Sequence, residues 1–310
     1  MNEETLFLVA KLYYEDKQTQ EEISRRIQVS RSTVSRLLQE AVERNIVTIK
    51  INYPWQRDLE LERRLVQRFS LVEVRVLDDR GRSEEHVLNG IGALAARLIE
   101  DRLIDGDVVG VSYGRSVASA VAALSPHKQV RVTAVPLLGA LGVENTAIDG
   151  PELVRKFAFA YGGDYRYILG PLLVKDERTR EALVQLPQIA EALAMARRAN
   201  WTLVGVGSVS HTSLIWSGYL DGRGLERMQA QGAVGHMCGQ FFDAQGQVLP
   251  ASINRRTIGV GLKSLSRMKG VIAIAAGREK AAAILGALKG KYVSNLVTDI
   301  SAASAILSIA

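Results

Sequence analysis

Glycine is distributed very unevenly along this chain of 310 residues. None of its 27 glycines precedes Gly81, and from there they recur at short intervals to the C-terminus. Glycine turns between apolar runs are typical of α/β units, whereas a stretch without glycine suits a compact helical module. Pro54 is the first proline and should end whatever element precedes it. We therefore expect two domains, with a boundary near residues 52–58.

The periodicity of apolar residues supports the same division. Residues 1–54 carry helical spacings, and residues 55–70 predict a linker helix with Leu59, Leu61 and Leu65 on one face. Residues 71–310 alternate short apolar runs with longer amphipathic stretches. Strands that alternate with helices of ten or more residues imply βαβ units and a largely parallel sheet. The expected fold class is α/β, with a small helical domain in front of a larger α/β domain.

The alternation predicts individual elements of the larger domain. We expect strands at 72–76, 107–112, 131–138, 165–169, 202–206, 271–275 and 293–298. We expect helices at 90–104, 117–124, 152–161, 181–198 and 279–288, and a last helix after residue 301.

The composition excludes several classes of protein. Hydrophobic residues make up 47% and charged residues 23%, which suits a globular chain rather than a disordered tail. The single Cys238 excludes an internal disulfide framework. The histidines have no short ligand spacing, so no structural metal is expected, and no cofactor. These histidines are His86, His127, His211 and His236.

Neither a signal peptide nor a membrane span is expected. The N-terminus is acidic, and no uncharged apolar run reaches the roughly 18 residues that a span requires. We therefore expect a soluble, cytoplasmic protein. Its formal charge of +6 favours an anionic partner, although the location of the charge matters more than its total.

The sequence pattern of the first fifty residues predicts a helix-turn-helix. Thr19, with Glu22 three residues later, forms a capping box that begins a short helix at Gln20. The chain breaks at Gln28-Val29, and Ser30 caps a second helix. The apolar stripe of this second helix consists of Val34, Leu37, Leu38 and Val42.

Hydrogen-bonding side chains crowd the start of that second helix, where a helix-turn-helix meets base edges in the major groove. Six basic and two acidic residues between Ser24 and Lys50 leave a net charge of +4 for phosphate contact. Ile46–Ile51 alternates like the strand of a wing. The alternative is a dimerisation hairpin with a solvated basic face. The candidate DNA-binding residues are Thr19, Gln20, Ser30, Arg31, Ser32, Thr33, Ser35 and Arg36.

A glycine turn joins the strand at 107–112 to the following helix. The N–H groups at such a helix start attract phosphate, Ser112 and Ser116 add hydroxyls, and Arg115 adds a positive charge. Gly110 and Gly114 permit close approach, but their spacing matches neither a Walker A loop nor a Rossmann fingerprint. A small phosphate ester therefore fits better than a nucleotide, and a plain βα turn is the alternative.

Further turns follow the other strands. Gly207 and Gly277 close two of them, and parallel sheets bind ligands at their carboxyl ends. Lys280 follows the second turn and is either a ligand contact or a surface lysine. Asp243 could accept hydrogen bonds from a sugar or cap its own turn. A neighbouring loop could also reach the crevice, and it contains or adjoins Gly139, Asn145 and Asp149. His236 is expected in the core or behind the site.

Several segments, taken together, resemble the SorC/DeoR-type sugar-binding transcriptional regulators of bacteria. The resemblance covers essentially the whole chain in the order of that family. The segments that carry it are Thr19–Val47, Gly106–Ser116, Gly235–Gly246 and Val271–Asp299.

The resemblance implies a winged helix-turn-helix domain followed by an effector domain with the fold of sugar-phosphate isomerases and deaminases. It implies a homotetramer or dimer, with sugars, polyols or sugar phosphates as effectors. By position, Ser112–Ser116 resembles the phosphate loop, Lys280 the neutralising lysine and Asp243 the carboxylate for sugar hydroxyls. This chain departs from the family at Tyr113 and Ser116, where Trp and Thr are frequent, and near Lys263, where an acid is common.

The leading hypothesis is a regulator of a carbohydrate-utilisation operon that binds partly palindromic operator DNA under the control of its effector. The alternative is a sugar-phosphate isomerase or deaminase with an added DNA-binding domain, but no catalytic acid–base constellation is evident. The predicted effector-binding residues are Gly110, Ser112, Tyr113, Gly114, Arg115, Ser116, Gly139, Asn145, Gly207, Asp243, Gly277 and Lys280.

Overall fold

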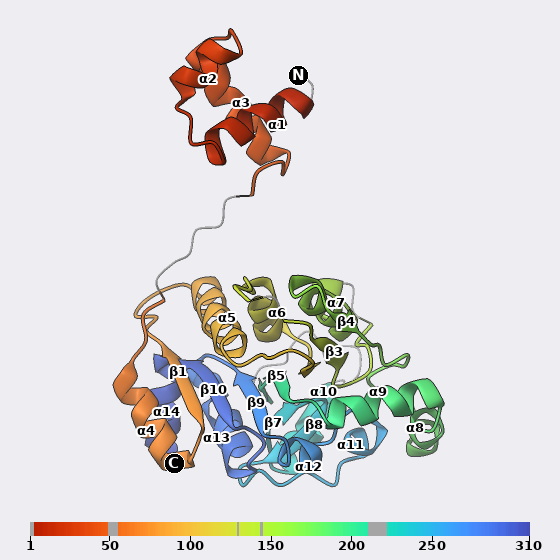
Figure 1. Cartoon of the computed structure of the whole chain (residues 1–310). Helices are drawn as coiled ribbons and strands as arrows, with labels where there is room; N and C mark the ends of the chain where they lie inside the picture. Colours follow the sequence, from red (N-terminus) through yellow and green to blue (C-terminus); the bar gives the residue numbers. More distant parts are fainter. Residues whose placement is uncertain (1–2, 49–54, 129, 143–144, 210–221) are drawn as a thin grey trace. The chain divides into compact units, whose positions relative to one another are not determined.

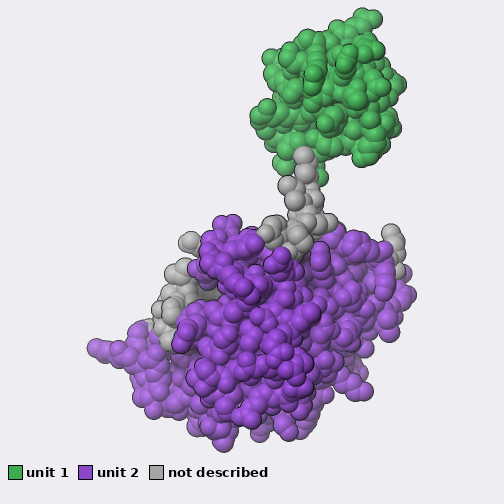
Figure 2. All heavy atoms as spheres, turned by 90° about the vertical axis from the view of Figure 1, so that its left-hand side faces the viewer, with its two compact units in different colours: residues 1–54 green, residues 55–310 purple. Residues whose placement is uncertain are grey.

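A computed structural model describes residues 3–48, 55–128, 130–142, 145–209 and 222–310 (Figure 1). The chain divides into two compact units, Met1–Pro54 and Trp55–Ala310, which Figure 2 shows in separate colours. We call them the small unit and the large unit and describe each by itself.

Three helices form the small unit: α1 (Glu3–Tyr14), α2 (Gln20–Arg26) and α3 (Arg31–Glu43). Each helix contributes apolar side chains to one core, as the helical spacing predicted. The buried core residues are Leu6, Val9, Ala10, Leu12, Ile23, Val34, Leu37, Leu38 and Ala41.

Side-chain caps determine where α2 and α3 begin. The Thr19 hydroxyl accepts a hydrogen bond from the Glu22 N–H at 3.2 Å, and the Glu22 carboxylate accepts one from the Thr19 N–H at 2.7 Å. This reciprocal pair is the predicted capping box. Ser30 caps α3 through the Thr33 N–H at 3.1 Å. Residues 46–48 form no strand, and the rest of the predicted wing strand lies outside the described residues.

A parallel sheet of seven strands forms the centre of the large unit, in the order β1-β10-β9-β5-β2-β3-β4. The pairings between neighbours are all parallel. The strands are β1 (Glu73–Leu77), β2 (Val108–Val111), β3 (Thr133–Pro136), β4 (Asp164–Tyr165), β5 (Trp201–Gly205), β9 (Gly270–Ile274) and β10 (Asn295–Asp299).

Helices cover both faces of this sheet, so its strands are apolar on both sides. One face packs against α5 (Glu84–Glu100), α6 (Arg115–Ala122) and α7 (Gly150–Ala160), as Figure 1 shows. The other face packs against α4 (Leu59–Phe69), α9 (Pro187–Arg197), α13 (Ala281–Lys289) and α14 (Ile300–Ile309). Alternate strand residues enter the two cores: Val109, Val111, Leu203 and Ile272 on the first face, and Val204, Val271, Ala273 and Leu296 on the second.

A second, antiparallel sheet of three strands packs against α13 and was not predicted. It consists of β6 (Gly207–Ser208), β7 (Ala233–Met237) and β8 (Gln240–Asp243). Gly235 allows the close packing, because an added Cβ there would lie 2.5 Å from the Ala283 Cβ. Short helices complete the unit: α8 (Glu177–Val184), α10 (Gly222–Ala230), α11 (Ser252–Arg256) and α12 (Leu262–Leu265), with 3-10 turns at Thr146–Ile148 and Arg278–Lys280.

The predicted strands and helices of the large unit correspond to observed elements, with two differences. The strand predicted at 165–169 shortens to the two residues of β4 at the sheet edge. The helix predicted at 90–104 is α5, which begins six residues earlier at Glu84, because Ser83 caps it through the His86 N–H at 3.3 Å. The helices predicted near 181–198 are α8 and α9, and Pro187 begins the second one. Proline at a first helical position is favourable because its missing N–H needs no partner there.

None of the described helices is both long enough and apolar enough to span a membrane.

Close packing of α5 on α6 provides a stability test. An added Cβ at Gly92 would lie 2.7 Å from the Ser119 carbonyl carbon, so Gly92→Ala should overpack the contact and destabilise the large unit by about 1–3 kcal/mol. Urea denaturation of the full chain measures this. Gly222→Ala is the control, because an added Cβ there meets nothing within 4 Å. Equal midpoints for the two variants would contradict the prediction.

Candidate functional site

The strand order creates a switch point between β2 and β5. After β2 the chain continues to its neighbour β3, whereas the next strand of this sheet after β5 is β9, on the opposite side. Connections that diverge in this way leave a crevice outside the carboxyl ends of the two strands, where open parallel sheets bind ligands. The loops that follow β2, β5 and β9 therefore border the candidate site.

The loop after β2 leads directly into the first turn of α6. Ser112 is buried, and its hydroxyl oxygen accepts a hydrogen bond from the Gly205 N–H at 3.4 Å, which ties the β2 and β5 ends together. Gly114 has φ 107°, which favours glycine, and it caps α6 without a side chain. Among the described residues, no atom lies within 4 Å of a Cβ added at Gly114. Ser116 lies in the same first turn.

The loop after β9 repeats this arrangement. Gly277 has φ 101° and precedes the turn Arg278–Lys280, again without a capping side chain. Its N–H donates to the Asp299 carboxylate at 2.9 Å. The Glu279 carboxyl group fills the space that a Gly277 side chain would take, since an added Cβ would lie 2.7 Å from its carbon. Both loops thus present a left-handed glycine at the start of a helical turn.

Two cations belong to these loops. Arg115, the first residue of α6, forms an ion pair with Glu84 at 2.8 Å. Burial lowers the pKa of Lys280, and the neighbouring Arg115 lowers it further, while Glu279, Glu84 and Asp299 oppose the shift. The structure therefore brings Arg115 and Lys280 within electrostatic range of each other. Two neighbouring cations repel unless an anion lies between or beside them.

His236 is buried and close enough to Lys280 to sense its charge, and the sequence predicted a core or supporting histidine here. It is opposite Gly207 in the β6–β7 ladder, and its ring occupies the space of the missing Gly207 side chain. Burial lowers the pKa of His236 to about 4, and Lys280 lowers it further. The imidazole is therefore neutral at pH 7. The absence of a side chain at Gly207 leaves room for the imidazole ring.

At two other predicted glycines, neighbouring atoms fill the space that a side chain would need. Gly110 lies within β2, where an added Cβ would meet side-chain atoms of Leu137 at 2.6 Å and Thr202 at 2.8 Å. Gly139 lies against the backbone of Pro171, 2.5 Å from its carbonyl carbon if a Cβ were added. The absence of a side chain at both positions is explained by neighbouring parts of the protein.

The loop between β3 and α7 is organised by Asp149. Its buried carboxylate accepts hydrogen bonds from the N–H groups of Leu141, Gly142 and Gly150 at 2.7–3.1 Å. Asn145 is exposed and caps a short 3-10 turn through the Ala147 N–H at 3.2 Å. Asp149 therefore holds the loop, while the Asn145 side chain remains at the surface.

Asp243 lies at the end of β8 and caps the turn that follows. Its Oδ1 accepts hydrogen bonds from the N–H groups of Gln245 at 2.9 Å and Gln247 at 2.8 Å, which is the turn-capping arrangement. Its carbonyl oxygen packs against Gly286 on α13, 2.9 Å from an added Cβ. In this structure the Asp243 carboxylate is therefore engaged by its own hairpin turn.

On the small unit, the predicted DNA-binding residues gather at the start of α3 and its flanks. Ser30, Arg31, Ser32, Ser35 and Arg36 are exposed, Thr19 and Gln20 begin the preceding helix, and Thr33 is half-buried. Among the described residues, neither Arg31 nor Arg36 has an ion-pair partner, whereas Arg25 pairs with Glu21 at 2.7 Å. The two arginines on α3 therefore keep their charge available for an external anion.

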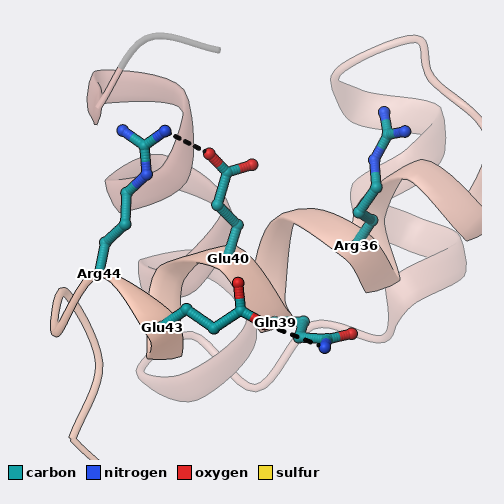
Figure 3. A pocket seen from close by; sticks show the side chains of 5 residues that line it. All are labelled: Arg36, Gln39, Glu40, Glu43 and Arg44. Atoms are coloured by element: carbon teal, nitrogen blue, oxygen red, sulfur yellow. Dashed lines mark hydrogen bonds and ion pairs between the residues drawn. The ribbon is translucent and has the colours of Figure 1, made fainter.

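A shallow groove on α3 adds residues that the sequence did not single out (Figure 3). Its lining consists of Arg36, Gln39, Glu40, Glu43 and Arg44. Gln39 donates to Glu43 at 3.1 Å and Arg44 pairs with Glu40 at 2.7 Å, whereas Arg36 extends away from both pairs. Helical spacing from Arg36 could have indicated Gln39, which lies one turn further along the same face.

Metal binding and thiol chemistry receive no support from the described residues. They contain no cluster of three or more His, Cys, Asp or Glu side chains that could hold a metal ion. Burial raises the pKa of Cys238 to about 12, so its thiol is protonated at neutral pH.

Comparisons with known proteins now place the chain. Residues 53–308 match the sugar-binding domain family (Sugar-bind), and residues 8–44 match the sigma-70 region 4 family. The sorbitol operon regulator of Klebsiella pneumoniae is 32% identical over 308 residues, covering 96% of each chain. The deoxyribonucleoside regulator of Bacillus subtilis (strain 168) is 30% identical, again over 96% of each.

A solved structure agrees with these sequences. The crystal structure of the full-length sorbitol operon regulator SorC from Klebsiella pneumoniae matches with a TM-score of 0.76 and 31% identity, covering 98% of each chain. The transcriptional regulator LsrR of Enterobacter sp. (strain 638) is 32% identical over 99% of this chain and 94% of its own.

The neutral, buried His236 predicts an acid-sensitive fold. Its pKa is near 6.5 when unfolded and about 4 when folded, so the stabilisation is complete above pH 6.5 and is lost as the pH falls toward 4. Between pH 7 and 4.5 this residue should account for roughly 2 kcal/mol of lost stability. Urea unfolding of the wild type and His236→Gln at both pH values measures the difference. The exposed His127→Gln is the control, and equal losses in wild type and His236→Gln would disprove the assignment.

Proposed function

The chain belongs to the SorC/DeoR-type family of sugar-binding transcriptional regulators. From this premise we propose which of its residues bind the effector and which bind DNA. The large unit binds a small sugar, polyol or sugar phosphate at the ends of β2, β5 and β9. The small unit binds operator DNA through α3. Occupancy of the first site changes the affinity of the second.

The observation that carries this proposal is the pairing of two uncapped glycine loops with two cations. The helical turns after Gly114 and Gly277 begin without a capping side chain, and Arg115 and Lys280 lie beside them. Backbone N–H groups at a helix start and a nearby cation are the groups that bind a phosphate. Membership of a sugar-binding family favours a sugar or polyol as the ligand, and these residues favour a ligand that carries a phosphate group.

We propose binding rather than turnover at this site. The relatives above are regulators by name. Sugar-phosphate isomerisation or deamination requires a positioned acid and base. Several titratable groups of the site have other partners. His236 is buried and neutral, and the Asp149 carboxylate accepts three backbone hydrogen bonds. Glu84 pairs with Arg115, and the Asp299 carboxylate accepts the Gly277 N–H.

On DNA, we propose that α3 enters the major groove with Arg31, Ser32, Ser35 and Arg36 toward the bases, and that Thr19, Gln20, Ser30 and Thr33 support it near the phosphates. A single helix-turn-helix reads only a few base pairs, so a homodimer or homotetramer would bind two half-sites of a partly palindromic operator. Coupling between effector and DNA is expected on the scale of 1–3 kcal/mol, the usual range for allosteric proteins.

Removal of the unpaired arginines tests the DNA surface. Arg31→Ala and Arg36→Ala should each weaken operator binding by about 5- to 150-fold, because a good arginine–base contact is worth about 1–3 kcal/mol. Gel-shift titration against the cognate operator measures this. Arg25→Ala is the matched control, since Arg25 is already paired with Glu21. Operator affinity unchanged in both α3 variants would show that another surface reads DNA.

The effector site is tested by thermal-shift screening of the full chain. A panel of sugars and polyols, each with its phosphate ester, should show larger stabilisation by a phosphorylated member, because bound ligand stabilises the folded state. Lys280→Ala and Arg115→Ala should each abolish most of that shift. A larger response to an unphosphorylated ligand, unaffected by either substitution, would contradict the phosphate assignment.

A further inference from the structure

An ion pair joins the start of α6 to the start of α5. Arg115 Nη2 lies 2.8 Å from Glu84 Oε1, and each residue is the first of its helix. The two helices follow β1 and β2 in a parallel sheet, so both begin at the same edge as the candidate site. The side chains are 64% and 79% exposed, which leaves the pair accessible to a competing anion.

Glu84 interacts with both cations of the site. Besides its contact with Arg115, it favours the charged form of Lys280, which burial and Arg115 disfavour. Glu279 and Asp299 act on Lys280 in the same sense, but Glu279 lies against Gly277, and Asp299 accepts the Gly277 N–H and caps α14. Among the ion pairs of the described residues, Arg115 pairs with Glu84 and with neither of the other two carboxylates, and the Glu84 side chain is exposed.

The same first turns of α5 contact the start of the large unit. The His86 ring lies on Trp55 with centroids 4.8 Å apart. Trp55 also occupies the space of a Gly90 side chain, 2.9 Å from an added Cβ. Trp55 directly follows Pro54, where the contact division between the units falls. Within about two turns, α5 therefore contacts both the candidate effector loop and the entry of the linker.

We propose that Glu84 is an internal anion that competes with a ligand phosphate for Arg115, and that its displacement is relayed through the first turns of α5 to Trp55. The inference rests on the proposed function, because it requires a phosphate to bind at Arg115 and Lys280. Beyond the proposed function, it assigns to Glu84 a role in setting the affinity for phosphate, and to the first turns of α5 a route from the site to Trp55. Since Glu84 is exposed, the competition is worth no more than an exposed ion pair, about two- to fivefold in affinity.

Inorganic phosphate is a suitable probe of the competition. Calorimetric titration of the full chain at low salt should give a two- to fivefold lower Kd for Glu84→Gln than for the wild type, because Arg115 is then unpaired. Glu85→Gln is the matched control: it removes the same charge from the same exposed first turn, and Glu85 has no ion pair among the described residues. Its Kd should equal that of the wild type.

The relay has a separate readout. With 5-fluorotryptophan in place of tryptophan, the Trp55 resonance is assigned by its loss in Trp55→Phe. Saturating phosphate should shift this ¹⁹F resonance in the wild type. Glu84→Gln should already show the shifted position without phosphate, since its carboxylate no longer holds Arg115.

The outcomes separate the two proposals. If phosphate binding is lost in Lys280→Ala but Glu84→Gln binds no tighter than Glu85→Gln, the competition is wrong and the proposed site stands. If the Trp55 resonance ignores both phosphate and Glu84→Gln, the relay is wrong. If phosphate fails to bind the wild type, or binds equally well to Lys280→Ala and Arg115→Ala, the phosphate site and the competition both fall.

Discussion

Parallel pairing of the seven central strands is the constraint on which the large unit depends. Because neighbouring strands run in the same direction, their carboxyl ends meet at one edge, and each following helix begins there with its N–H groups toward solvent. Ser112 and Gly205 are 93 residues apart and still share a hydrogen bond at this edge. The sheet therefore brings loops that are remote in sequence to one edge, where they border one site.

Charge at this edge follows from the same geometry. The positive ends of helical turns, Arg115 and Lys280 all lie at the edge where the parallel strands end, and burial makes the ammonium of Lys280 costly. Carboxylates of the protein compensate this charge: Glu84 pairs with Arg115, and Glu279, Glu84 and Asp299 favour the charged form of Lys280. A site that is already partly neutralised binds its anion less tightly but responds to it by rearranging the internal ion pair, which is what a regulator requires.

Local features were largely predictable. The capping box of Thr19 and Glu22 and the strand–helix alternation appear where the sequence indicates them, because caps and periodicity depend on residues within a turn or two. The small antiparallel sheet was missed, since its strands are short and Gly235 interrupts β7. In the site, Arg115 influences the charge of Lys280, the Asp243 carboxylate caps its own turn, and packing explains Gly110.

The sequence by itself determined the starts of α2 and α3, the glycine turns after the strands and the family. Caps and turns are expressed in short runs of neighbouring residues, and the family in several such runs along the chain. Only the tertiary structure decided the strand order and hence the switch point between β2 and β5. It also decided that His236 fills the space of Gly207 and that Glu84 reaches Arg115. These contacts join segments about 30 residues apart, and their partners are chosen by how helices and strands pack, which no local spacing specifies.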